Sequence, residues 1–288
     1  METTKLPHPP MKPLAPPPPA TKPPAPNGLR PTPVKGKHSI NVGLKTDVQK
    51  VVLFSSGGAG KTSLAAAIQQ VGIKPLFLDL EQGSRHCDVA RIDTIETWED
   101  LRGILHDYEL LEPYGAIIID SLTRAEEMAA TWTCANVMHE KGHQVKSIEG
   151  YGFGKGMTHV YETFLCLLGD LDALARRGKH IICTAHECVA SVPNPAGEDW
   201  SRYEPRLQSP ASGKSSIRHR TKEWADHMLY IGFDVFVNED GKAQGGGTRT
   251  IFPTEMPTHL AKSRSLADPI AYTKGSADLW KLLLKGAK

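Results

Sequence analysis

The stretch VVLFSSGGAGKTSLAAA, residues 51–67, decides the fold class of this chain. Four apolar residues lead into a cluster of glycines, and an alanine-rich segment follows, which is the order of a buried strand, a tight turn and a helix. Glycines in such a turn let backbone N–H groups converge on an anion beside the start of the helix. In this setting Lys61 can reach phosphate groups, and the hydroxyl of Thr62 can bind Mg²⁺. The stretch therefore predicts a loop that binds ATP together with Mg²⁺.

Eight residues make up the predicted nucleotide-binding loop: Ser56, Gly57, Gly58, Ala59, Gly60, Lys61, Thr62 and Ser63. Ser55 stands where the usual pattern Gly-x-x-x-x-Gly-Lys-Thr has its first glycine, and Gly57 and Gly58 can supply the turns that the loop needs. A second class of nucleotide hydrolase, the partition-type ATPases, adds a lysine at the front of the loop. Ser56 occupies that position here, so the resemblance to that class fails at its defining residue and is kept as an alternative.

Strand and helix signals alternate from about Lys45 onward. Apolar strands are predicted at residues 50–54, 74–81, 115–120 and 180–186. Helices are predicted at residues 61–70, 97–111 and 159–178. This alternation favours right-handed crossovers and a mostly parallel sheet, whose continuously apolar strands need helices on both faces. Strands at 226–238 and 248–253 predict an antiparallel hairpin that extends the sheet, so the expected fold class is α/β.

The composition changes along the chain and indicates three parts. Residues 1–44 form a basic, proline-rich tail that we expect to be disordered, because 13 of the 22 prolines fall within residues 1–37 and proline cannot join helix or sheet ladders. A spacer is the simplest interpretation of this tail, beside a docking peptide or a tether for nucleic acid. Residues 45–265 are the predicted ATPase core, and residues 266–288 are a C-terminal extension with a short helix.

Charge and cysteine content narrow the classes of function. The formal net charge is +2, and residues 1–40 alone carry six Lys or Arg against one acid, so the rest of the chain is slightly acidic. Any interaction with nucleic acid must therefore depend on local patches. Five cysteines without a Cys-x-x-Cys pair favour a reducing cytoplasm over a disulfide framework or a zinc site. No apolar run approaches the roughly 20 residues that span a bilayer, so we expect no membrane partner.

A phosphate loop also needs an acid that holds the metal and a group that activates water. Asp120 ends the apolar strand GAIIID and is, with Thr62, the predicted metal ligand. Glu81 ends the strand KPLFLDLE, at the edge where ligands bind in open α/β sheets, and it is the predicted general base. Asp79 lies two residues earlier and points to the same side of an extended strand. The choice between Glu81 and Asp79 as the base stays open at this point.

The order of these motifs resembles the RecA-like core of P-loop ATPases: the loop, the LDLE strand, the IIIDS strand and a strand ending in CTAH. The resemblance implies that Glu81 is the catalytic carboxylate, acting with Lys61, and that His186 senses the γ-phosphate. In RecA-like helicases and recombinases, a Lys/Arg pair of one subunit reaches the nucleotide of its neighbour. Lys262 and Arg264 in HLAKSRS match that pair, so the resemblance implies catalysis across a homo-oligomer.

More narrowly, the chain resembles the phage-encoded RecA-like ATPases of the Sak-four group, which act with single-strand annealing recombination systems. The resemblance covers about residues 48–265, and its shared features are the E-x-G after the second strand, IDS, TAHE, EWADHML and the late Lys-x-Arg. It implies an ATP-dependent enzyme of phage DNA recombination or annealing in the host cytoplasm. A single-strand-binding or annealing protein is the implied protein partner.

Two segments occupy the places where RecA-like proteins carry DNA-binding loops. Residues 140–157 combine five glycines with lysines and with Tyr151 and Phe153, a mixture suited to phosphate contacts and base stacking. Residues 187–222 contain further arginines and lysines, together with the aromatic residues Trp200 and Tyr203. We therefore expect single-stranded DNA as a partner. Outside the enzyme class, the alternative is a nucleotide-gated adaptor that recruits recombination or replication proteins without turnover.

Overall fold

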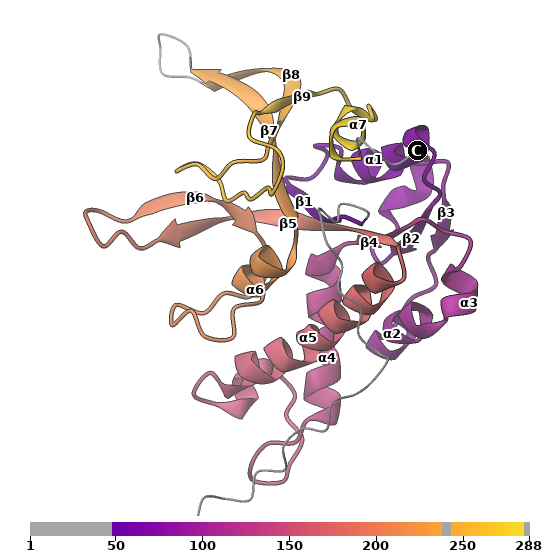
Figure 1. Ribbon diagram of the computed structural model, residues 1–288. Helices are drawn as coiled ribbons and strands as arrows, with labels where there is room; N and C mark the ends of the chain where they lie inside the picture. The colour runs from indigo at the N-terminus through magenta and orange to yellow at the C-terminus, as the bar shows by residue number, and fades with distance from the viewer. Residues whose placement is uncertain (1–47, 238–242, 285–288) are drawn as a thin grey trace, which may run out of the picture. The chain divides into compact units, whose positions relative to one another are not determined.

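The computed structural model describes residues 48–237 and 243–284 (Figure 1). The tail predicted at residues 1–44 lies outside the described residues. Part of the turn of the predicted hairpin, between the strands predicted at 226–238 and 248–253, also lies outside them. Within the described ranges, no helix is long and apolar enough to cross a bilayer.

One sheet runs through the described part of the chain (Figure 1). Its strands are β1 (Lys50–Ser55), β2 (Pro75–Asp79), β3 (Ala90–Ile92), β4 (Ala116–Asp120), β5 (His180–Val192), β6 (Trp200–Pro205), β7 (His227–Val237), β8 (Ala243–Phe252) and β9 (Ile270–Tyr272). Their order is β3-β2-β4-β5-β1-β7-β8-β9, and β6 pairs with β5 off this path. Strand pairs from β3 to β7 are parallel, whereas β6, β8 and β9 join antiparallel. The predicted α/β class, with its mostly parallel sheet and its C-terminal antiparallel hairpin, is confirmed.

Helices cover both faces of this sheet (Figure 1). They are α1 (Lys61–Ala66), α2 (Trp98–His106), α3 (Tyr108–Leu111), α4 (Leu122–Asn136), α5 (Lys155–Arg176), α6 (Ile217–Trp224) and α7 (Asp278–Leu283). Alternate residues of the central strand β1 face the two layers. Val52 and Phe54 share a core with α2, α4, α5 and α6, whereas Val51 and Leu53 share a core with α1 and α7. Burial of both faces explains why the strands read as continuous apolar runs.

The strand predicted at residues 180–186 continues to Val192 as β5 and turns back as β6. Their antiparallel ladder pairs Val189 with Tyr203, so the segment expected to be a loop from residue 187 begins as a hairpin. These strands mix polar and apolar residues and lack the continuous apolar run that identified the others, which is why the sequence did not predict the hairpin. Strands β3 and β9 also escaped prediction, since three residues are too few to show a period.

Residues beyond 265 pack against α1, the helix that follows the phosphate loop. β9 extends the sheet beside β8, and α7 shares the core of α1. Trp280 of α7 is 1% exposed, and its indole N–H donates to the carbonyl oxygen of Leu64 over 2.6 Å. The hydroxyl of Tyr272 donates to the carbonyl oxygen of Gly60 over 2.9 Å. The C-terminal extension therefore fixes both the end of the loop and the first turns of α1.

Replacing Trp280 with alanine should lower the free energy of unfolding by about 3–5 kcal/mol, because a fully buried indole ring is lost from the core. Urea denaturation followed by circular dichroism measures the change. Lys281→Ala, on the exposed side of α7, is the matched control and should change the free energy by less than about 0.5 kcal/mol. A loss below about 1 kcal/mol for Trp280→Ala would contradict the docking of α7 on α1.

Candidate nucleotide site

The phosphate loop joins the end of β1 to the start of α1. Gly58 and Gly60 have φ angles of 78° and 102°, in the left-handed region that favours glycine. A Cβ atom on Gly60 would lie 3.0 Å from the hydroxyl oxygen of Tyr272, so this position needs glycine for space as well. α1 begins at Lys61, and the N–H groups of its first turn have no acceptor within the helix. The backbone of the loop is therefore built to receive an anion.

Lys61 lies buried at the centre of this loop. Its ammonium donates to the carbonyl oxygens of Ser55 and Ser56 over 3.1 and 2.9 Å. Burial lowers the pKa of Lys61, and nearby carboxylates, led by Asp120, oppose that shift. A cation withdrawn from water in this way interacts strongly with an anionic group that reaches it.

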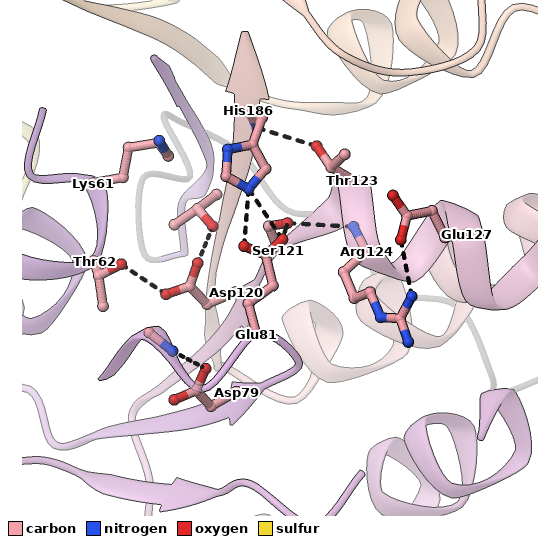
Figure 2. Close-up of polar contacts among 12 residues, drawn as sticks. Lys61, Thr62, Asp79, Glu81, Asp120, Ser121, Thr123, Arg124, Glu127 and His186 are labelled. Atoms are coloured by element: carbon pink, nitrogen blue, oxygen red, sulfur yellow. Dashed lines mark hydrogen bonds and ion pairs between the residues drawn. The ribbon is translucent and has the colours of Figure 1, made fainter. Parts of the chain in front are cut away.

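Asp120 joins three elements at the same edge of the sheet (Figure 2). The Thr62 hydroxyl donates to Oδ2 over 2.8 Å, and the Thr184 hydroxyl of β5 donates to Oδ1. Burial raises the pKa of Asp120, and the two threonine hydroxyls oppose the shift. A hydroxyl and a carboxylate in contact are hard oxygen ligands of the kind that Mg²⁺ takes, so these residues fit that ion.

Glu81 lies just beyond the end of β2 and faces β5 (Figure 2). The Ser121 hydroxyl donates to its Oε1, and Nε2 of His186 lies 2.8 Å from its Oε2. Burial alone would raise the pKa of Glu81, but the hydrogen bonds from Ser121 and His186 outweigh it and hold the pKa below its ordinary value. At neutral pH the side chain is therefore a carboxylate, the form that accepts a proton.

Asp79 makes different contacts, although the sequence predicts that it points to the same side as Glu81. Its two carboxylate oxygens accept hydrogen bonds from the backbone N–H groups of Gly83 and Ser84, each over 2.9 Å. The Ser84 hydroxyl also donates to it, and the side chain is buried. β2 ends at Asp79, so the alternation of an extended strand does not continue to Glu81. Asp79 thus orders the turn after β2, while Glu81 contacts His186.

The sheet edge beyond the phosphate loop brings together five of the predicted residues: Lys61, Thr62, Glu81, Asp120 and His186. Lys262 and Arg264 lie elsewhere, near the start of β1. The Lys262 ammonium donates to carbonyl oxygens at the end of α6, the shortest contact being 2.7 Å to Ala225. Arg264 pairs with Asp226 over 3.2 Å, and Asp226 also accepts from the backbone N–H of Lys50.

Several polar residues at the site were not among the predicted ones. Ser121 and Thr184 lie inside the quoted motifs IIIDS and CTAH, and their places next to Asp120 and two residues before His186 are the signal that could have identified them. His86 and Lys274 line a cavity of about 130 Å³ on the α1 side of the loop. Lys274 comes from the C-terminal extension, where no motif marks it.

The segment at residues 140–157 separates its two aromatic residues. Tyr151 is buried, and its hydroxyl donates to the carbonyl oxygens of Thr133 and Val137. Phe153 is fully exposed, with a φ of 47° that is unusual for a residue other than glycine. Of the two rings that the sequence offered for base stacking, only that of Phe153 is open to a partner.

Several of the arginines and lysines in residues 187–222, which the sequence offered for DNA binding, form ion pairs within the protein. Arg202 lies 2.7 Å from Glu204 and 2.6 Å from Glu255, and Arg218 also pairs with Glu204. Lys222 pairs with Glu255 as well. This network is internal to the hairpin and its neighbours, so these cations are less available to phosphate groups than the sequence suggested.

Glu126 of α4 lies close to the site, one turn after Thr123, whose hydroxyl accepts from the backbone N–H of His186. Both carboxylate oxygens of Glu126 accept from the backbone N–H of Gln208, over 2.9 and 3.0 Å. Burial raises the pKa of Glu126 to about 7, against the opposing hydrogen bond from Gln208. This carboxyl group therefore titrates near neutral pH.

The sequence and the structure were compared with known protein families and solved structures. A family model described as an AAA domain matches residues 47–265, which is more than half of the chain. No curated protein matches the sequence. Among solved structures, the chain is similar to the KaiC-like protein PH0186 from the hyperthermophilic archaeon Pyrococcus horikoshii OT3. That similarity has a sequence identity of 14% and a TM-score of 0.41, and it covers 78% of this chain and 85% of that chain.

The raised pKa of Glu126 predicts a pH-dependent stability. A folded-state pKa of about 7 exceeds that of an unfolded carboxyl group, so the protonated group stabilises the fold at low pH and this contribution is lost as the pH rises from about 4.5 through 7. Glu126→Gln, which stays neutral, should raise the free energy of unfolding at pH 8 by about 1–3 kcal/mol, with a smaller gain at pH 5.

Urea denaturation at a series of pH values measures this difference. Glu127→Gln is the matched control, because the exposed side chain of this next residue pairs with Arg124 and its charge makes the smallest of the contributions that shift the pKa of Glu126. It should change the free energy by less than about 0.5 kcal/mol at either pH. An identical pH profile for Glu126→Gln and the unmodified chain would show that Glu126 does not titrate as inferred.

Proposed function

The chain belongs to the AAA-domain family, and on that premise we propose that it is a Mg²⁺-dependent ATPase of RecA type whose turnover is coupled to single-stranded DNA. ATP binds the loop at residues 56–63 in this proposal, with Lys61 on the β- and γ-phosphates. The resemblance to the Sak-four group extends the proposal to phage DNA recombination or annealing in the host cytoplasm, with an annealing or single-strand-binding protein as partner.

One observation carries the proposal. The carboxylate of Glu81 contacts Ser121 and His186 at the same sheet edge where Thr62 contacts Asp120 and Lys61 lies in the loop. A proton acceptor, a pair of metal-binding oxygens and a phosphate-binding cation at one edge are the parts that phosphoryl transfer to water requires. Asp79 is bound by its own turn, which favours Glu81 as the base.

In the proposed reaction, the oxygen of a water molecule bonds to the γ-phosphorus of ATP, and the bond from that phosphorus to the β–γ bridging oxygen breaks. Glu81 takes the proton of the water, and ADP and inorganic phosphate are released. His186 connects Glu81 to β5 and senses the γ-phosphate. Thr62 and Asp120 would hold Mg²⁺, which would neutralise charge on the phosphate oxygens.

Two features support DNA as the coupled ligand. The fully exposed ring of Phe153 offers a face for base stacking, in a segment that also contains Lys141 and Lys146. In the second segment, Arg206 and Lys214 are exposed and free of the ion-pair network formed by Arg202 and its neighbours. The lysines and the arginine would contact the phosphates of the strand, which makes binding dependent on salt.

Glu81→Gln should lower kcat for ATP hydrolysis by about 100- to 10,000-fold while ATP still binds, because the amide cannot take the proton of water. Lys61→Ala should abolish turnover, because the cation of the loop is lost. Single-stranded DNA should stimulate the unmodified chain. Phosphate release with and without DNA, together with binding of a fluorescent ATP analogue, measures each effect.

Asp79→Asn serves as the control for the assignment of the base. It should lower the free energy of unfolding, since it weakens the turn at Gly83 and Ser84, and it should lower kcat far less than Glu81→Gln does. Equal turnover by Glu81→Gln and the unmodified chain would instead favour the nucleotide-gated adaptor. Turnover that no DNA changes would contradict the DNA part of the proposal.

The Lys/Arg pair predicts how subunits cooperate. We propose that Arg264 serves the nucleotide of a neighbouring copy, while Lys262, which binds carbonyl oxygens at the end of α6, holds the segment in place. Arg264→Ala should lower kcat by about 1,000-fold or more, in the range of an arginine supplied in trans. Mixed with Lys61→Ala subunits, it should regain activity, because some interfaces then pair an intact loop with an intact arginine. Assays across mixing ratios test this, and no recovery at any ratio would refute it.

A further inference from the structure

A cavity of about 770 Å³ lies between the hairpins β5–β6 and β7–β8, next to the phosphate loop. Its lining includes Ser56 of that loop, Glu187 of β5, Tyr203 of β6 and Tyr230 and Phe233 of β7. Figure 1 shows both hairpins extending from the same edge of the sheet. None of the steps of ATP hydrolysis described above uses this cavity.

Stacked aromatic rings form one wall of the cavity. The rings of Tyr203 and Tyr230 have centroids 5.4 Å apart and planes at 12°, and Tyr230 also stacks on His259 with centroids 5.0 Å apart. Tyr203 remains 41% exposed although Tyr230 stacks on its ring. Phe233 remains 40% exposed, with the Arg249 guanidinium over its ring. A flat ring system gains about 1–3 kcal/mol from stacking on such a surface.

Glu187 adds a polar contact to this aromatic wall. Its Oε2 atom is buried and has no hydrogen-bond partner among the residues that the structure describes. Burial raises the pKa of Glu187, and the Lys61 ammonium, the Tyr230 hydroxyl and the backbone N–H of Ser56 oppose that shift. A buried acceptor without a donor is costly, so a ligand that brings an N–H group gains that energy back.

We propose that this cavity binds a nucleobase, which stacks on Tyr203 and donates a hydrogen bond from its exocyclic amino group to Glu187. The base can come from single-stranded DNA, and in that case the inference rests on the proposed function. A free nucleoside or nucleotide is the other source of the same chemistry. One acceptor oxygen without a partner calls for one donor, which cytosine, adenine and guanine carry on an amino group. Uracil has a carbonyl oxygen at the position where cytosine has its amino group, so it lacks that donor. Its remaining edge donor, the ring N3–H, is flanked by two carbonyl oxygens that the Glu187 carboxylate repels.

The position of Glu187 links the cavity to the nucleotide site. Successive residues of a strand point to opposite sides, so His186 faces Glu81 while Glu187 faces the cavity. Glu187 also interacts with Lys61 and Ser56 of the phosphate loop. A base that binds Glu187 therefore acts on the residue of β5 next to His186, which contacts the proposed water-activating Glu81.

Oligonucleotides that differ in one functional group test the proposal. Fluorescence anisotropy at pH 7.5 compares labelled oligo(dC) with oligo(dU) of equal length on the full chain. We expect oligo(dC) to bind about tenfold more tightly, the effect of one hydrogen bond to a charged acceptor. Glu187→Leu, which keeps the bulk but removes the acceptor, should bring the two affinities within about twofold of each other. The two oligonucleotides share the backbone charge, so phosphate contacts cancel in the comparison.

Tyr203 gives the second set of variants. Tyr203→Ala should weaken oligo(dC) binding about 5- to 100-fold by removing the stacking face. Tyr203→Phe, the matched control, keeps the ring and should stay within about twofold of the unmodified chain. Circular dichroism of each variant confirms folding. If Tyr203→Ala does not fold, the comparison of oligo(dC) with oligo(dU) on the unmodified chain and on Glu187→Leu still decides the question.

Titration of cytidine and uridine by calorimetry forms the second arm. Equal binding of oligo(dC) and oligo(dU), or a preference that survives Glu187→Leu, would overturn the inference, and DNA-stimulated ATP turnover would then leave the proposed function standing. Cytidine binding that depends on Glu187, without any DNA binding, would support the cavity as a site for a free base and contradict the DNA part of the function. Absence of binding in both arms would overturn the inference.

Discussion

The nucleotide site depends on one buried carboxylate, that of Asp120. It accepts hydroxyl hydrogen bonds from Thr62 in the first turn of α1 and from Thr184 on β5, so three elements meet at a single charge. An isolated buried carboxylate is strongly unfavourable, and the two donors are needed to stabilise it. Because β1, β2, β4 and β5 are parallel neighbours, their carboxyl ends share one edge, and this contact fixes that edge around the phosphate loop.

Three acids cluster there, and their surroundings give them different chemistry. Asp79 and Asp120 are 1% and 5% exposed, and each is held by donors of the protein itself. The Glu81 side chain is 30% exposed, and its partners Ser121 and His186 are polar side chains rather than a closed turn. A carboxylate that water can reach, with its charge stabilised by hydrogen bonds, is suited to take a proton from water, which supports the proposed role of Glu81.

The sequence predicted the parallel sheet, the phosphate loop and the acids at the strand ends, because continuous apolar runs and glycine clusters are local signals. It could not separate Asp79 from Glu81, since that depends on where β2 ends and on which backbone N–H groups the next turn presents. It also grouped Tyr151 with Phe153, although one ring is buried and the other exposed. The β5–β6 hairpin escaped because its strands are stabilised by pairing with each other rather than by two apolar faces.

The place of Arg264 limits how it can contribute to catalysis. Arg264 pairs with Asp226, which also accepts from the backbone N–H of Lys50, the first residue of β1. The phosphate loop begins at the other end of this strand, after its last residue, Ser55. A strand rises about 3.3 Å per residue, so about 16 Å of β1, from Lys50 to Ser55, separates Arg264 from the loop of its own chain. If this arginine neutralises charge on a nucleotide, that nucleotide belongs to another copy. An isolated subunit would then hold the water-activating group without the arginine, and hydrolysis would depend on assembly.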